Sequence, residues 1–155
     1  MRLVEQALGL TLLVAIGLAT VNVGLRYLFA TSFDWVEEVL ALLFTGWVFL
    51  GMPLVALRGE HIALDLLSAR LSPRAVRGLH LFAVAVAAIV LAVATYGSFI
   101  AVRNIARFGQ QSVVAGIPSV IPHGIVLTGI VSTLVIALFA LFALIRGARG
   151  AMARR

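Results

Sequence analysis

Long apolar runs alternate with short polar segments along the chain, which is the pattern of an all-α integral membrane protein. A helix needs about 20 mostly apolar residues to cross a bilayer. The fourth apolar run is taken to begin after Pro118 and near Pro122, because proline suits the first turn of a helix better than its interior. Four runs are therefore predicted to span the membrane: residues 7–25, 39–57, 79–102 and 122–145.

The composition strengthens this interpretation. The chain has 155 residues, of which 63% are hydrophobic and 12% are charged, whereas a soluble domain carries about 25% charged residues. So much apolar surface cannot be hidden in a soluble domain of this size. The chain has no cysteine, which excludes disulfides, thiolate nucleophiles and cysteine-ligated zinc. We expect a single membrane domain covering residues 1–155.

The first span could instead be a cleaved signal peptide, since Arg2 precedes an apolar segment that contains the small residues Ala15, Gly17 and Ala19. The run is long for such a peptide, however, and Glu5 lies where a signal peptide has its basic segment. We therefore expect the segment to remain as a membrane helix.

The basic residues predict how the chain is oriented. All twelve are arginines, and they lie at the edges of the apolar runs rather than along one face, so the net charge of +6 does not indicate a nucleic-acid partner. Four spans place both termini on one side, and arginine is enriched in cytoplasmic segments. Both termini are thus predicted to be cytoplasmic, in the bacterial inner membrane. That side holds nine arginines and the other side three: Arg2, Arg58, Arg70, Arg74, Arg77, Arg146, Arg149, Arg154 and Arg155 against Arg26, Arg103 and Arg107.

The connections between the spans have patterns of their own. Residues 62–71 alternate apolar and charged positions, which predicts a short amphipathic helix on the cytoplasmic surface that ends at Ser72-Pro73. Residues 104–116 are predicted to form an outer-surface segment, where a second horizontal helix would fit, because five positions in it are polar: Asn104, Arg107, Gln110, Gln111 and Ser112. Asp34 is expected to cap the start of the second span, with Glu37 at capping-box spacing.

The interiors of the four spans contain no charged residue. Substrate and ion pathways in membranes are normally marked by such residues, and transporter cores by paired broken helices. The only comparable break here, at residues 116–122, has no counterpart in the first half. These features predict an accessory or scaffold subunit that does not carry a polar solute by itself.

Catalytic and metal sites are not expected. His61 and Asp65 are four residues apart, but two ligands do not make a zinc site. Glu37 and Glu38 are adjacent, so on a helix they point about 100° apart and are poorly placed to act as a carboxylate pair. No phosphate-binding G-x-x-x-x-G-K-[ST] motif is present.

A series of short motifs resembles a known family. The series is Asn22-Val23-x-x-Arg26-Tyr27, Ser32-x-x-Trp35-x-Glu37-Glu38, Trp47-x-Phe49-Leu50-Gly51 and Arg58-Gly59-x-His61-Ile62-x-Leu64-Asp65. In its order and spacing it is similar to the small membrane subunit, the DctQ type, of tripartite ATP-independent periplasmic (TRAP) transporters. The resemblance is dense from residue 22 to residue 65. Later it consists mainly of length, four-span layout and an Ile117-Pro118 element.

The resemblance implies partners that composition does not reveal. A large membrane permease subunit holds the substrate and sodium sites, and a periplasmic binding protein delivers the substrate, commonly an organic acid. Uptake is driven by an ion gradient, usually of sodium, and the small subunit enlarges the static scaffold of an elevator-type permease. The chain ends soon after the fourth span, so we expect a separate large subunit. His123 stands where the family often has an aromatic residue, and residues 110–120 match only loosely, which leaves docking of the binding protein there open.

Several residues are candidates for structural or interface roles, and none for catalysis. Arg26 is expected to pair with Glu37 or Glu38 and so tie two helices together, or else to contact a lipid headgroup or the binding protein. Tyr27 and Trp35 suit the aromatic belt at the membrane surface. Trp47 and Gly51 are predicted to face the large subunit. The complete candidate set is Asn22, Arg26, Tyr27, Trp35, Glu37, Glu38, Trp47, Gly51, Arg58, His61 and Asp65.

A rival interpretation remains open from the residues alone. Four uncharged helices could assemble as a self-contained oligomeric channel or exporter lined by serine and threonine, or could form a membrane-embedded enzyme. Flux through vesicles that contain this chain and nothing else would distinguish a channel from a subunit.

Overall fold

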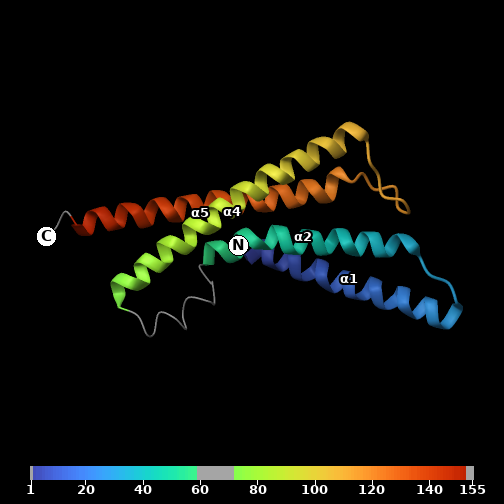
Figure 1. Cartoon of the computed structure of the whole chain (residues 1–155). Helices are drawn as coiled ribbons and strands as arrows, with labels where there is room; N and C mark the ends of the chain where they lie inside the picture. Colours follow the sequence, from blue (N-terminus) through green and yellow to red (C-terminus); the bar gives the residue numbers. More distant parts are fainter. Residues whose placement is uncertain (1, 59–71, 153–155) are drawn as a thin grey trace.

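The computed structural model describes residues 2–58 and 72–152, most of which form four long helices (Figure 1). In chain order these are α1 (Arg2–Phe29), α2 (Asp34–Arg58), α4 (Pro73–Phe108) and α5 (Val120–Met152). Each contains a segment long and apolar enough to cross a membrane, at Gln6–Phe29, Asp34–Leu57, Ala75–Phe108 and Val120–Arg146. The prediction of an all-helical protein with four membrane-spanning helices is thus confirmed.

The helices extend beyond the predicted apolar runs, most of all in α4. This helix has 36 residues, a length of about 54 Å, while the hydrocarbon core of a bilayer is about 30 Å thick. The expectation of a second horizontal helix at residues 104–116 is wrong, because residues 104–108 continue α4. The helix ends only at Gly109, whose left-handed φ of 59° suits glycine and whose backbone N–H donates to the carbonyl of Ile105.

The start of α4 follows the predicted restart of the chain. The Ser72 side chain accepts a hydrogen bond from the backbone N–H of Ala75, and Pro73 occupies the first turn, where its missing N–H costs nothing. The predicted surface helix at 62–71, together with His61 and Asp65, lies outside the described residues.

The helices form an open layer in which α1 packs on α2, α2 on α5, and α5 on α4 (Figure 1). The α1–α2 and α4–α5 connections, residues 30–33 and 109–119, lie at the same end of the molecule, called the loop end below. The helix α1 makes its main contact with α2, and α4 makes its main contact with α5, which it crosses in Figure 1.

Close packing within the layer is confined to a few small or branched residues. Among the glycines of the described residues, the closest approach to another helix is at Gly129 of α5: a Cβ there would lie 2.6 Å from the Phe49 carbonyl carbon of α2 and would collide with its oxygen. Small residues allow membrane helices to approach in this way. Most large apolar side chains point outward instead, and the buried apolar residues of the described segments are Ala15, Val36, Ala88, Ile105 and Ile130.

Candidate functional site

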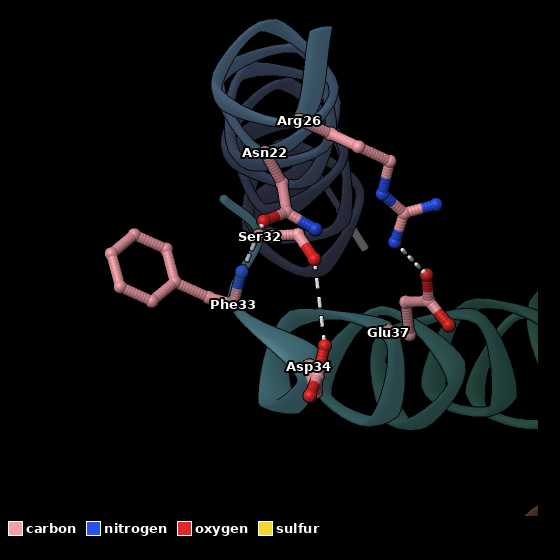
Figure 2. Close-up of polar contacts among 6 residues, drawn as sticks. All are labelled: Asn22, Arg26, Ser32, Phe33, Asp34 and Glu37. Carbon is pink, nitrogen blue, oxygen red and sulfur yellow. Dashed lines mark hydrogen bonds and ion pairs between the residues drawn. The ribbon is translucent and has the colours of Figure 1, made fainter. Parts of the chain in front are cut away.

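Polar contacts gather at the loop end, where Asn22 holds the turn between α1 and α2 (Figure 2). Its side chain is 6% exposed, and its Oδ1 accepts a hydrogen bond of 2.8 Å from the backbone N–H of Phe33. The chain reverses here through Ala30, which has a left-handed φ of 51°. A buried amide that satisfies a backbone donor fixes the turn, because an unpaired buried N–H would be costly.

The first turn of α2 does not use the predicted cap. The helix begins at Asp34, so this residue is the first helical residue, and its carboxylate receives only a long contact of 3.5 Å from the Ser32 hydroxyl (Figure 2). The Asp34 carboxylate therefore accepts no hydrogen bond from a backbone N–H of the first turn of α2, as the predicted cap would. Its place near the turn is taken by Asn22, which is eleven residues before Phe33.

Arg26 and Glu37 form an ion pair between α1 and α2 (Figure 2). The Arg26 Nη2 atom lies 2.9 Å from Glu37 Oε1, and the two side chains are 53% and 67% exposed. Of the two partners expected for Arg26, the structure selects Glu37. An ion pair as exposed as this one contributes at most about 1 kcal/mol, so it guides the alignment of the helices rather than holding them together.

Glu38 turns away from Glu37 and binds the α4–α5 connection. Its Oε2 accepts hydrogen bonds from the Ser112 hydroxyl at 2.6 Å and from the Ala115 N–H at 2.8 Å, and its Oε1 accepts one from the Val114 N–H at 3.1 Å. Hydrogen bonds to an ionised group are shorter and stronger than neutral ones. One carboxylate thus anchors a connection more than 70 residues away to the first turn of α2.

The α4–α5 connection is itself well organised. The Ser112 N–H donates to the Ile117 carbonyl at 2.8 Å, the Ile117 N–H donates to the Ser112 hydroxyl at 3.0 Å, and Gln111 pairs with Pro118 in an isolated antiparallel bridge. Gly116 has a φ of 64°, a conformation that glycine adopts without strain. The resulting narrow loop presents its backbone donors to Glu38.

A small open cavity of about 220 Å³ lies beside Glu38. Its walls come from α2, the connection and the start of α5, and within residues 2–58 and 72–152 no three histidine, cysteine or acidic side chains gather as metal ligands. The Glu38 carboxylate at its edge already accepts three hydrogen bonds from the α4–α5 connection. The residues lining it are Glu38, Ala41, Leu42, Thr45, Ser112, Ile117, Ser119 and Pro122.

A second, almost wholly apolar groove of about 340 Å³ runs along α2 beside α5. Trp47 lies at its edge, where its indole Nε1 donates to the Thr11 hydroxyl of α1 at 2.9 Å. A Cβ at Gly51 would meet no atom within 4 Å. The groove is lined by Trp47, Val48, Gly51, Met52, Val55, Ala56 and Thr133.

The other candidate residues are more dispersed. Tyr27 and Trp35 are 84% and 44% exposed near the loop end, as belt residues would be. Arg58 is the last residue of α2. The sequence did not indicate Ser112 as a site residue, because nothing in it signals that a serine so distant from Glu38 will contact this carboxylate. For the same reason it did not predict that the α4–α5 connection binds Glu38.

A comparison with known protein families identifies the family of this chain. The family described as tripartite ATP-independent periplasmic transporters, DctQ component, matches residues 15–150, which includes parts of α1 and α5 and the whole of α2 and α4. The chain belongs to this family. The match extends through the second half, where the sequence motifs were sparse. A search among curated proteins gave no match.

Membership in the DctQ family fixes the general role of the chain. It is a small membrane subunit of a TRAP transporter and a component of transport rather than an enzyme. Proteins of this family work together with a large permease and a binding protein. The four apolar helices agree with a multi-pass protein of the inner membrane.

Proposed function

We propose that this chain is a static scaffold for the large permease subunit, in a transporter that takes up an organic acid delivered by a periplasmic binding protein. The observation that carries the proposal is the lack of any aspartate, glutamate, lysine, arginine or histidine in residues 7–25, 39–57, 81–102 and 124–145. Substrate and ion pathways in membranes are marked by ionisable side chains at membrane depth. Those groups, and the coupling to an ion gradient that is usually of sodium, are assigned to the large subunit.

The uncovered surface of the helices supports a scaffold. In the most apolar window of each span, at most 17% of the residues are buried inside the chain. Lipid covers part of this surface, and a second membrane subunit would cover another part. A layer with few internal contacts gains rigidity when a partner packs on it, because each helix is then held by more than one neighbour.

The scaffold is proposed to have both termini in the cytoplasm, as the arginine distribution predicts. The loop end, with Arg26, the Glu38-bound connection and the exposed Val113, then faces the periplasm. The binding protein approaches from this side.

The apolar groove at Trp47 and Gly51 is proposed as a surface for the large subunit. Gly51→Leu would place a branched side chain in space that the chain itself leaves empty. Recovery of the large subunit on a tagged chain in mild detergent should fall severalfold. Gly46→Leu on the same helix is the matched control, because its Cβ also meets no atom within 4 Å and it projects about 140° away. Unchanged recovery and uptake for Gly51→Leu would count against this surface.

Reconstituted transport tests the role as a whole. Vesicles that contain the large subunit, the binding protein and this chain should accumulate a labelled organic acid when an ion gradient is imposed. Vesicles that lack this chain should accumulate much less, and vesicles with this chain alone should accumulate none. Selective flux through the chain alone would overturn the proposal in favour of an oligomeric channel.

A further inference from the structure

Tyr96 of α4 carries a polar group at membrane depth on an uncovered surface. Its side chain is 69% exposed. The flanking arginines Arg77 and Arg103 place the middle of the apolar run at residue 90, so Tyr96 is six residues, or about 9 Å along the axis, from the middle. The hydrocarbon core extends about 15 Å to each side of the midplane. The residue therefore lies within the core and not at the interfacial belt.

The direction of the Tyr96 side chain keeps its hydroxyl from reaching the membrane surface. Helical side chains tilt towards the helix N-terminus. Since Tyr96 lies on the C-terminal side of the middle of the span, this tilt carries its hydroxyl towards the midplane. The hydroxyl points towards the midplane whichever side of the membrane carries the termini.

The serine and threonine hydroxyls in three of the four spans are satisfied within their own helices. Those of α1, α2 and α5 donate to the backbone carbonyl three or four residues earlier: Thr11, Thr20, Thr45, Thr128, Ser132 and Thr133. In α4 the Thr95 Oγ1 atom is buried without a hydrogen-bond partner among the described residues, although a rotation of this short side chain would bring it to a carbonyl of its own helix. Tyr96 cannot reach such a carbonyl, because its rigid ring carries the hydroxyl away from its own helix, and a hydroxyl left without a partner in hydrocarbon is costly.

Tyr96 is part of a regular stripe on the uncovered side of α4. The stripe consists of large residues at alternating intervals of four and three, the spacing of a helix that packs along another helix. The buried apolar residues of α4, Ala88 and Ile105, lie outside this stripe, and the helix on which α4 packs is α5. The members of this α4 stripe are all exposed: Phe82, Val86, Ile89, Val93, Tyr96 and Ile100.

We propose that the α4 stripe is a docking surface for a transmembrane helix of the large permease subunit, which supplies a hydrogen-bond partner to the Tyr96 hydroxyl. The proposal rests on the proposed function and names one of its contact surfaces. Lipid chains would cover the apolar members of the stripe equally well but offer nothing to the hydroxyl. A protein helix with a polar side chain or an accessible carbonyl does, and the membrane partner of this family is the large subunit.

The decisive variant is Tyr96→Phe, which keeps the ring and removes only the hydroxyl. In mild detergent, with the large subunit titrated against a tagged chain, we expect binding to weaken about threefold to tenfold, the effect of losing one hydrogen bond between membrane helices. The matched control is Thr20→Val, which removes an exposed span hydroxyl that already has a partner in its own helix. Binding of this control should equal that of the unaltered chain.

A photoreactive side chain at Val93, one turn from Tyr96, provides the second measurement. We expect it to crosslink to the large subunit in the assembled transporter. Binding unchanged by Tyr96→Phe, or crosslinks only to lipid or to a second copy of this chain, would overturn the proposal. If the unaltered chain recovers no large subunit at all, the proposed function has failed rather than the assignment of this surface.

Discussion

At the scale of single residues, the neighbours Glu37 and Glu38 show how a helix divides its contacts. Successive residues on a helix point about 100° apart, so Glu37 meets Arg26 of α1 while Glu38 meets the α4–α5 connection. The Arg26–Glu37 pair joins residues only eleven positions apart and could be anticipated from the sequence. The Glu38–Ser112 contact could not, because it depends on how α5 is placed beside α2.

The first prediction concerns Glu38. In Glu38→Gln the charge is lost and one of the two acceptor oxygens becomes an NH₂ donor, so at least one of the three donors of the connection loses its partner. We expect hydrogen exchange at the Val114 and Ala115 amides to become severalfold faster.

Glu37→Gln is its control, measured at the same two amides. It removes the ion pair with Arg26 but no contact to the connection, so their exchange should stay as in the unaltered chain. Equal protection in both variants would show that Glu38 does not organise the loop.

At the scale of helices, the contact between α2 and α5 depends on Gly129. A single added carbon at this position would collide with the backbone of Phe49, and backbone cannot move aside as a flexible side chain can. The sequence showed glycines on both helices but not which of them meet. Gly46, Gly51 and Gly124 have open space where a Cβ would lie, so only the assembled layer separates the contact glycine from the others.

The second prediction follows from this contact. Gly129→Ala should force α2 and α5 apart and lower the free energy of unfolding by about 1–3 kcal/mol, the usual cost of overpacking. Thermal or denaturant unfolding in detergent would measure the loss. Gly124→Ala on the same helix should be nearly neutral, since its Cβ meets no atom within 4 Å. A Gly129→Ala protein as stable as Gly124→Ala would contradict the close approach.

The lengths of the helices illustrate a limit of hydropathy. The apolar runs predicted four helices, and each run lies within one of the helices of the structure, because each run must be buried in lipid. They did not predict that α4 continues to Phe108, since residues 104–108 are polar enough for a surface loop yet contain nothing that breaks a helix. The break comes from Gly109, which permits the left-handed cap.

At the scale of the molecule, the open layer has two ends that must face opposite sides of the membrane. Both described connections lie at the loop end (Figure 1). The charge distribution predicts that this end faces the periplasm, since the sequence places three arginines, Arg26, Arg103 and Arg107, on this side of the predicted spans and nine on the other. This orientation is what would place the Glu38-bound connection within reach of the binding protein.

The third prediction tests the orientation, and the lack of native cysteine makes it simple. A cysteine at Val113, which is 98% exposed in the α4–α5 connection, should react with a membrane-impermeant maleimide added to intact cells from which the outer membrane has been removed. A cysteine at Ala75, exposed in the first turn of α4, should react only after the inner membrane is opened. The reverse pattern would place both termini outside.

The sequence by itself determined that the chain crosses a membrane as four helices, where those helices lie and that their interiors carry no charge. Each of these follows from the free energy of transferring individual side chains and backbone groups into hydrocarbon, which is a property of local segments. The motifs from Asn22 to Asp65 also indicated the family, and a family match over residues 15–150 confirmed it. Only the tertiary structure decided that α5 lies between α2 and α4, that Glu38 holds the α4–α5 connection, that Gly129 is the close contact and that Tyr96 is left facing outward. These depend on which helices become neighbours. Since apolar helices compete for one another against equally apolar lipid, hydropathy carries no information about that choice.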